Sequence, residues 1–370
     1  MTAPNASNFL VFADKMFAPS ESFIHRAYTS FSRLNPIYIG HEIRGPAPDG
    51  VEYIKLRDYH GWAGETGFKQ FGIVSKKLLK RLEQEEPKLI HAHFGKSGAY
   101  ALPLAKALNI PLVVTYHGGD ATKHANTKNS FLRVYNRRRQ NVWDNAALIL
   151  PCSEFIGREL EAKGCPTSKM QVHRNTADPN RFYPGEKENI LLFAGRWIEK
   201  KGIDTLIKAL ARVTPQLEGW TIRLLGEGPL KEQLVQMLHD AGINAQLPGW
   251  IPADDMPKEF ARTSIVCIPS KRATSGDAEG LPMVCIEAQL AACSVLATRH
   301  AGIPECIIDG ETGFLVDEDD HVALAEKLSI LLAAPEQTIK MGRAGQLHAK
   351  TNFDLNIQSK ALEEKLLNLI

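Results

Sequence analysis

Residues 265–298 read Ile265-Val-Cys-Ile-Pro-Ser270, a polar loop ending in Glu279-Gly-Leu-Pro282, an apolar run from Met283 to Ala292, and Val295-Leu-Ala-Thr298. This order of patterns predicts a strand, a loop, a helix and a second strand, which together make one parallel crossover unit. Pro282 suits the first turn of the helix, where a missing N–H costs nothing. Gly280 has no side chain that would keep a ligand away from the backbone.

The start of this predicted helix is a candidate phosphate site. Unpaired N–H groups and the helix dipole give such a position partial positive charge. The backbone groups that would surround it belong to Gly280, Leu281, Met283 and Val284.

Two carboxylates frame the same helix start. Glu279 lies in the loop before it and Glu287 about one turn inside it. Both can accept hydrogen bonds from hydroxyls, so the pair fits a ligand with a central phosphate and sugar-like groups at both ends. The alternative is that Glu279 only complements the helix dipole and Glu287 is a solvated helix residue.

Strand and helix patterns alternate along the whole chain, which predicts an α/β protein with parallel sheets covered on both faces. One series of short apolar runs extends from Phe9–Ala13 to Met170–His173, and a second begins at Ile190–Ala194. The polar segment 175–187 contains two prolines and a glycine and is expected to be the linker. We therefore expect two doubly wound domains, residues 1–180 and 188–353.

Composition narrows the range of functions. A chain of 370 residues suits two domains, and a net charge of +2 gives no general attraction for nucleic acid. No apolar run is long enough for a signal peptide or a membrane span, so a cytoplasmic protein is expected. The six cysteines lack Cys-x-x-Cys spacing, and no cofactor or metal site is indicated. The absence of Gly-x-Gly-x-x-Gly after the first strand argues against a dinucleotide-dependent oxidoreductase.

Several motifs resemble one known family. The segment Ser270–Ala288 resembles the donor-site motif of family 4 retaining glycosyltransferases. The run Gly302-Ile-Pro-Glu305 and the segment Gly310–Val316 also look like that family. The resemblance implies the GT-B fold, which has two Rossmann-like domains with a cleft between them. It also implies that the C-terminal helix, residues 354–370, returns to the first domain.

The resemblance assigns roles in the donor site. Gly195-Arg-Trp-Ile-Glu-Lys-Lys-Gly202 is similar to the family motif that places Arg196 and Lys201 on the donor diphosphate. Fixed cations there would stabilise the charge that grows on the leaving phosphate. The backbone of Ile251, after Leu247-Pro-Gly-Trp250, matches the position that meets the nucleobase. Trp250 itself could equally belong to the core.

Further matches lie in the first domain. His117 corresponds to the family's active-site histidine, and Gly118 and Gly119 would let a substrate approach the backbone. Asp120 has a weaker assignment because it could be a helix cap. The segment Ala18–Ile24 resembles a motif of members that build bacterial surface polysaccharides, and its candidate cleft residues are Ser20, Glu21 and Ser22.

The chain also departs from the family pattern. The loop after the first strand lacks a pair of glycines, and Asn175-Thr-Ala177-Asp178 stands where many members have Asn-Gly-x-Asp. His91 and His93 alternate on a predicted strand with metal-like spacing, but no acidic or cysteine partner lies nearby in the sequence, which favours packing.

These features lead to a functional hypothesis. We expect a retaining, metal-independent glycosyltransferase that moves a sugar from a UDP- or GDP-linked donor to a glycan or polyprenyl-linked acceptor. The basic segment Ile73–Leu82 and Arg137–Arg139 suggest peripheral association with the inner membrane, although a solvated basic helix face explains them equally well. The alternatives are a nucleotide-sugar epimerase and a non-catalytic nucleotide-sugar binding module.

Overall fold

The computed structural model describes residues 6–123 and 130–370, with the side chains of Ser20 and of residues 130–133 also outside the described part. It divides into two compact units. The first unit comprises Met1–Arg174 and Asn356–Ile370, and the second comprises Asn175–Leu355. Residues 175–180, which the sequence analysis assigned to the first domain, therefore belong to the second unit.

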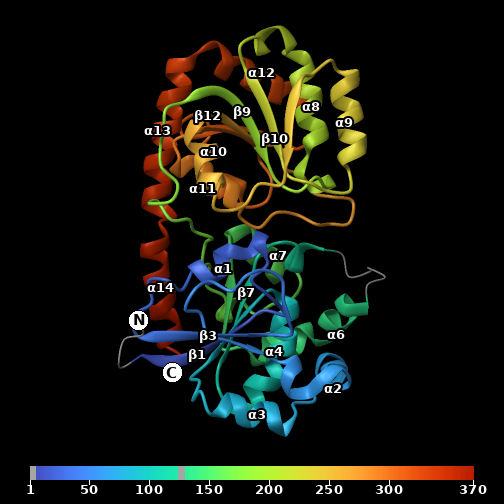
Figure 1. Ribbon diagram of the computed structural model, residues 1–370, viewed down its shortest axis with the longest axis vertical. Coiled ribbons are helices and arrows are strands. Elements are labelled where there is room, and N and C mark those ends of the chain that lie inside the picture. The colour runs from blue at the N-terminus through green and yellow to red at the C-terminus, as the bar shows by residue number, and fades with distance from the viewer. Residues whose placement is uncertain (1–5, 124–129) are drawn as a thin grey trace. The chain divides into compact units, whose positions relative to one another are not determined.

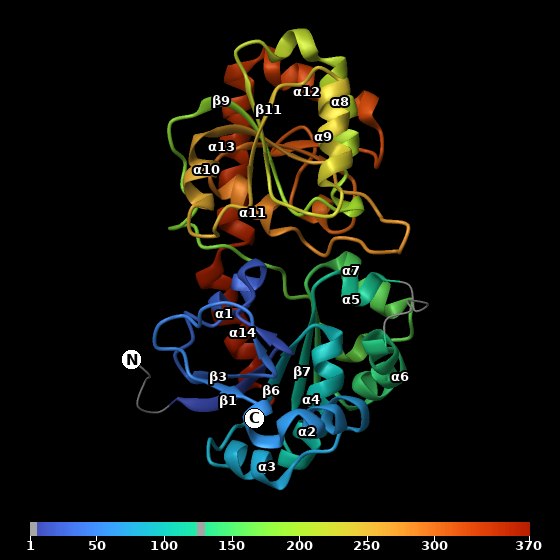
Figure 2. The same ribbon diagram turned by 45° about the vertical axis from the view of Figure 1, so that its right-hand side comes forward.

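The first unit is built on a six-stranded parallel sheet (Figures 1 and 2). Its strands pair in the order β5 (Tyr53–Lys55), β3 (Leu34–Gly40), β1 (Ser7–Phe12), β6 (Ile90–His93), β7 (Leu112–Tyr116) and β8 (Leu148–Pro151). Its helices are α1 (Ser22–Arg26), α2 (Arg57–Phe71), α3 (Lys76–Glu83), α4 (Gly95–Leu108), α5 (Gly119–Thr122), α6 (Ser130–Asn145) and α7 (Glu154–Glu161). The two-residue strands β2 (Lys15–Met16) and β4 (Glu42–Ile43) pair separately.

The last helix, α14 (Leu355–Leu367), packs on this first sheet. Its Leu362 and Leu366 are buried in one cluster with Phe9 and Val11 of β1. The carboxylate of Glu363, also buried, accepts backbone N–H groups of Ser32, Arg33 and Leu34 at 2.8, 2.7 and 2.9 Å. A helix distant in sequence thus completes both the apolar core and the polar bonding of the first unit.

The second unit has its own six-stranded parallel sheet. The strands pair in the order β11 (Ala245–Gly249), β10 (Thr221–Leu225), β9 (Glu188–Ala194), β12 (Thr263–Ile268), β13 (Ser294–Thr298) and β14 (Gly313–Val316). Its helices are α8 (Ile203–Arg212), α9 (Lys231–Asp240), α10 (Met256–Arg262), α11 (Met283–Leu290), α12 (His321–Ala333) and α13 (Pro335–Asn352). The strand order reverses between β9 and β12, which is where sheets of this kind bind ligands.

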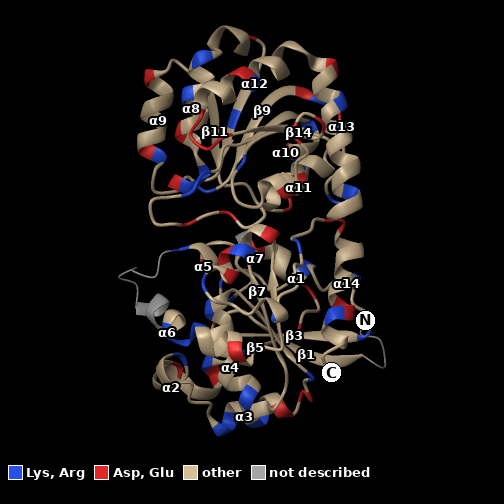
Figure 3. Cartoon of the chain, turned by 180° about the vertical axis from the view of Figure 1, so that it is seen from behind, with Lys and Arg blue, Asp and Glu red and all other residues tan. Residues whose placement is uncertain are grey.

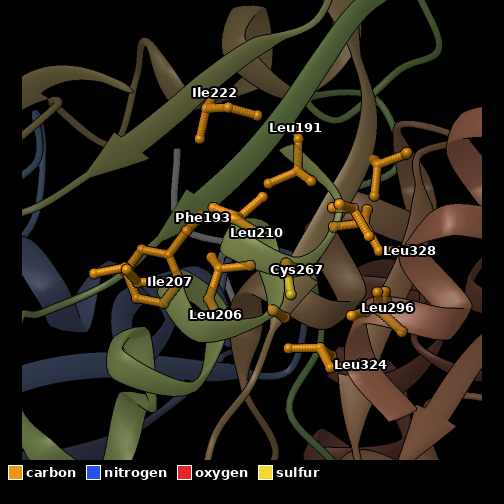
Figure 4. Close-up of a cluster of buried hydrophobic side chains, with 14 of the residues drawn as sticks. Leu191, Phe193, Leu206, Ile207, Leu210, Ile222, Cys267, Leu296, Leu324 and Leu328 are labelled. Carbon is orange, nitrogen blue, oxygen red and sulfur yellow. The ribbon is translucent and has the colours of Figure 1, made fainter. Parts of the chain in front are cut away.

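The core of the second unit explains why these segments form strands and helices. Alternate side chains of β9, among them Leu191 and Phe193, point to one face of the sheet and meet Leu206 and Leu210 of α8 (Figure 4). Leu324 and Leu328 of α12 pack into the same cluster. Period-two burial in strands and a three-to-four residue spacing in helices are the patterns expected of a sheet covered by helices.

The predicted fold class is confirmed, because both sheets are parallel and Rossmann-like. One predicted strand was wrong: Met170–His173 forms only a single bridge, between Met170 and Ile149. Its residues donate N–H groups to the carbonyls of Ile149 and Pro151 at the edge of β8, without building a ladder. Among the residues the structure describes, no helix combines the length and the apolar character needed to cross a bilayer.

Candidate active site

The predicted donor residues lie at the carboxyl edge of the second sheet. Four adjacent strands, β9, β12, β13 and β14, each end in a segment that contributes to the same cluster of side chains. Lys200 and Lys201 follow β9 in the short turn η3 (Glu199–Lys201), Glu279 follows β12, and His300 follows β13. Segments distant in sequence meet here because parallel strands end at one edge.

Glu279 is the buried centre of the cluster, with 7% of its surface exposed. Its Oε1 lies 2.9 Å from Nζ of Lys201 and its Oε2 lies 3.9 Å from Nζ of Lys200. Lys200 also pairs with Asp277 at 3.2 Å. Burial by itself would raise the pKa of Glu279, but the charges of Lys201 and Lys200 outweigh it and lower the pKa to about 2. The carboxylate is therefore ionised and held in place.

A second layer supports Glu279 through its backbone. Its N–H donates to Nε2 of His300 at 3.1 Å, and Nδ1 of His300 lies 2.6 Å from Oε1 of Glu318. Burial lowers the pKa of His300, against the opposing effect of Glu318. A neutral ring that donates from Nδ1 and accepts at Nε2 satisfies both contacts. The sequence reasoning missed His300 and Glu318, although both follow predicted strands at the carboxyl edge.

The turn after β9 brings the basic residues to this cluster. Gly202 has φ of +62°, and a Cβ there would lie 1.8 Å from the carbonyl oxygen of Pro269. Glycine is needed because the turn touches the backbone of the loop after β12. Gly195 is partly buried, whereas the side chain of Arg196 is exposed and has no ion pair or hydrogen bond among the residues the structure describes. Arg196 is thus a cation available to a ligand.

The helix α11 begins at Met283, so Pro282 precedes the helix rather than lying in its first turn as expected. Pro282 has extended dihedrals and occupies the N-cap. The N–H groups of Met283 and Val284 have no partner within the helix, as at any helix start. Nearby, the carbonyl of Gly280 accepts the N–H of Gly302 at 3.0 Å, and the carbonyl of Leu281 accepts Nδ2 of Asn175 at 2.8 Å.

Glu287 lies in α11 and is partly exposed. Burial raises its pKa to about 7, against the opposing charge of Arg181. No hydrogen bond or ion pair of its side chain is found in the described part of the chain. Its oxygens are thus open to hydroxyl donors, unlike those of Glu279.

The proposed nucleobase position lies after β11. Ile251 is partly buried two residues beyond the strand, and 56% of the surface of Trp250 is exposed. Trp250 is therefore not a core residue, which was one of the two interpretations left open.

In the first unit, Asp120 organises the loop that carries His117. Its carboxylate accepts N–H groups of His117 at 3.1 Å, Gly118 at 2.9 Å and Gly95 at 3.0 Å. Gly118 has φ of +146°, a conformation that favours glycine. Burial raises the pKa of Asp120, and these three bonds oppose the shift. Asp120 thus fixes the backbone around His117, and Gly119 begins α5 beside it.

The ring of His117 is held by neighbours on both sides. It packs against Phe23 and Phe94, with ring centroids 5.0 and 4.8 Å away. Its Nε2 lies 3.0 Å from Nδ1 of His93. Glu21 and Ser22 are partly buried where α1 begins, so the predicted segment leads directly to Phe23. The side chain of Ser20 lies outside the described part.

His91 and His93 participate in hydrogen bonds inside the first unit, as the packing interpretation requires. Within the described ranges, no group of three or more His, Cys, Asp or Glu side chains is arranged to hold a metal ion. The predicted residues therefore gather in two places, one in each unit.

Two family models match the chain, one mainly over each unit. A family model described as "Glycosyl transferases group 1" matches residues 175–348, and one described as "Glycosyltransferase Family 4" matches residues 37–181.

Two curated relatives have specific names. The chain is 30% identical over 248 residues to the putative colanic acid biosynthesis glycosyltransferase WcaL of Salmonella typhimurium, covering 64% of this chain and 60% of that protein. It is 27% identical over 293 residues to a GDP-mannose-dependent phosphatidylinositol monomannoside mannosyltransferase of Mycolicibacterium smegmatis. This match covers 74% of this chain and 75% of that protein. The match to WcaL thus leaves about two fifths of that relative uncovered.

A solved structure of Anabaena HepE in complex with UDP has the same fold. Its TM-score is 0.76 at 20% identity, and the alignment covers 98% of this chain and 100% of HepE.

Proposed function

Because the chain belongs to the group 1 and family 4 glycosyltransferases, with family models that together span residues 37–348, we propose that it is a retaining enzyme that transfers a sugar from a nucleotide-diphosphate sugar to a hydroxyl group. The observation that carries the proposal is the ionised, buried Glu279 beside Lys201 at the start of α11. A fixed carboxylate accepts hydrogen bonds from sugar hydroxyls, while the adjacent cations and N–H groups receive a phosphate.

The proposed roles follow from the charges. Arg196 is exposed and unpaired in the described part of the chain, so it supplies positive charge to the donor diphosphate together with the N–H groups of Met283 and Val284. Lys201 is already paired with Glu279. In this proposal the one lysine contacts both the donor phosphate and the carboxylate that accepts hydrogen bonds from the sugar hydroxyls. These groups stabilise charge on the leaving phosphate, which is why we propose a reaction that needs no divalent metal.

We propose a surface glycan or a lipid-linked glycan as the acceptor. WcaL is named for colanic acid biosynthesis, and the mycobacterial relative for a phosphatidylinositol mannoside. For the donor, HepE binds UDP and the mannosyltransferase depends on GDP-mannose. A UDP- or GDP-linked sugar is therefore the donor class to test first.

The test is a transfer assay with UDP- and GDP-sugars, in which product NMR reports the anomeric configuration. Glu279→Gln and Arg196→Ala should each lower kcat by about 10²–10³-fold, because each removes a transition-state contact. The matched control is Glu259→Gln, an ion-paired glutamate of α10 whose Oε1 lies 3.0 Å from Arg223. An inverted product, an absolute metal requirement, or donor turnover without acceptor would contradict the proposal.

We further propose that the enzyme works at the cytoplasmic face of the inner membrane. In α3, Leu78 and Leu82 are buried, so its apolar stripe belongs to the core. Exposed apolar side chains occur instead in α2 and in the loop after it, where Trp62, Phe71 and Ile73 are 80%, 76% and 62% exposed.

Lys76, Lys77 and Lys80 of α3 are exposed in the same part of the chain, and Figure 3 shows the basic residues along this helix. Apolar side chains next to lysines fit an anionic lipid surface.

Flotation with vesicles containing phosphatidylglycerol tests this part of the proposal. The variant carrying Trp62→Ala, Phe71→Ala and Ile73→Ala should lose binding, and high salt should weaken binding of the wild type. Leu347→Ala is the matched control, because Leu347 is 70% exposed in the second unit. Equal binding by the triple variant and the control would contradict a membrane contact at this segment.

A further inference from the structure

Five side chains of the first unit form one continuous hydrogen-bonded chain that ends at His117. Oγ1 of Thr115 lies 2.7 Å from Nε2 of His91, and Nδ1 of His91 lies 2.8 Å from the hydroxyl of Tyr28. That hydroxyl lies 2.5 Å from Nε2 of His93, and Nδ1 of His93 lies 3.0 Å from Nε2 of His117.

The members come from three segments that meet on one face of the first sheet. His91 and His93 belong to β6, Thr115 belongs to the adjacent β7, and Tyr28 follows α1 (Figure 2).

The interior members of this chain are buried and uncharged. His91, His93, Tyr28 and Thr115 are each no more than 4% exposed. Burial lowers the pKa of His91 to about 3 and takes the pKa of His93 well below its ordinary value. Burial also raises the pKa of the Tyr28 hydroxyl. Each imidazole therefore has one N–H and one acceptor nitrogen, and the phenol has one proton to donate.

Because each group has one proton to donate, the protons can be ordered along this series of hydrogen bonds in two ways. In the first, Thr115 donates to His91, His91 to Tyr28, Tyr28 to His93, and His93 to Nε2 of His117. In the second, every bond is reversed and Thr115 only accepts. The protons of all members are linked, because reversing one bond forces the next to reverse as well.

Thr115 decides between the two orders. In the second order its hydroxyl proton needs another acceptor, and the part of the chain that the structure describes provides none. A buried hydroxyl without an acceptor is costly, so the first order is favoured. His117 then accepts at Nε2 and carries its proton on Nδ1, because the partner of one ring nitrogen sets the state of the other.

We propose that Tyr28, His91 and His93 are positioning residues that hold His117 as the neutral tautomer with its proton on Nδ1. The consequence for transfer rests on the proposed function: Nε2 of His117 already accepts from His93 and Nδ1 already carries a proton, so the ring does not take a proton from the acceptor. The acceptor proton must then go elsewhere, and the departing phosphate oxygen is the group that gains negative charge.

The experiment is NMR of the full chain labelled with ¹⁵N-histidine, using long-range ¹H–¹⁵N correlations that distinguish protonated from unprotonated ring nitrogens. The chain has 12 histidines, so the spectrum of His117→Asn identifies the His117 signals by their loss. The wild type should show an unprotonated Nε2 and a protonated Nδ1 at His117. A protonated Nε2 would overturn the proposal.

Tyr28→Phe keeps the ring but breaks the series of hydrogen bonds at its centre. The ¹⁵N signals of His117 should then indicate a mixture of the two tautomers. Tyr38→Phe is the matched control, because Tyr38 is buried beside Tyr28 and, among the described residues, its hydroxyl donates only to the backbone carbonyl of His25. Thr115→Val provides a second break if Tyr28→Phe does not fold. Unchanged His117 shifts in the folded broken variants would overturn the proposal. The readout needs no substrate, so a failure here is distinct from a failure to transfer sugar.

Discussion

At the residue scale, His300 shows how one side chain positions a proposed catalytic group, Glu279, through its backbone. It fixes the backbone of Glu279 and is itself fixed by Glu318. His300→Leu removes both contacts and should lower kcat by about 10-fold or more, a loss of the size seen when the groups that support metal ligands are removed. His300→Gln keeps an acceptor for the Glu279 N–H and should recover part of the rate. Equal rates in the two variants, with unchanged melting temperature, would contradict this role.

Glu287 gives a prediction about pH. Burial raises its pKa from 4.5 to about 7. The contribution of this group to folding stability is therefore complete at pH values below its pKa in the unfolded chain, and it is lost as pH rises through about 7. Hydroxyl groups of a donor need the ionised form as acceptor. The donor KM should therefore fall as pH rises from about 6 to about 8. Glu287→Gln should remove this slope, and a slope of equal size in that variant would assign it to another group.

The sequence pointed to Glu279, Arg196 and His117 through their resemblance to family 4 motifs, and each of these residues also stands next to a glycine. It could not identify His300, because a histidine after Arg299 carries no spacing signal until the strand order is known. The interpretation of His91 and His93 as packing residues was incomplete for a similar reason. Tyr28, which joins them, is more than 60 residues away in sequence.

At the element scale, α14 stabilises the first unit through Glu363. Three backbone N–H groups donate to this buried carboxylate, and the N–H group of Leu34 is itself buried, so Glu363→Ala removes the acceptor of all three. We expect a loss of about 2–4 kcal/mol in the free energy of unfolding of the first unit. Glu364→Ala is the matched control, because Glu364 pairs with Arg33 at the exposed surface and such pairs contribute about 0–1 kcal/mol. Urea unfolding of both variants measures the difference, and equal losses would contradict it.

The elements that sequence patterns predicted well are those with buried, continuous apolar runs, such as β1 and β9. The short strand β5 was missed because only Ile54 of its three residues is buried. Met170–His173 has an apolar and polar alternation, but it pairs on one side only and is too irregular to extend the sheet. Edge segments are decided by neighbours in space, which the local pattern does not contain.

At the scale of the whole molecule, the structure moves the start of the second unit from residue 188 to residue 175. Phe182 is buried against Phe260, with ring centroids 5.9 Å apart, and Nζ of Lys187 donates to the carbonyls of Phe260 and Ala291. A fragment 175–355 should therefore fold and bind UDP or GDP, and it should melt at a higher temperature than a fragment 188–353. Thermal shifts with each nucleotide measure both properties. A higher melting temperature for the shorter fragment would contradict the boundary.

The route of the chain has a consequence for biosynthesis. Because residues 356–370 complete the first unit, the ribosome must make all of 175–355 before that unit has its last helix. At about 5–20 residues per second this interval lasts roughly 10 to 40 s. During it, Phe9 and Val11 lack the cover of Leu362 and Leu366, so the nascent first half exposes apolar surface while the second half can already fold. The later half is thus expected to mature first, and the earlier half to depend on chaperones until translation reaches α14.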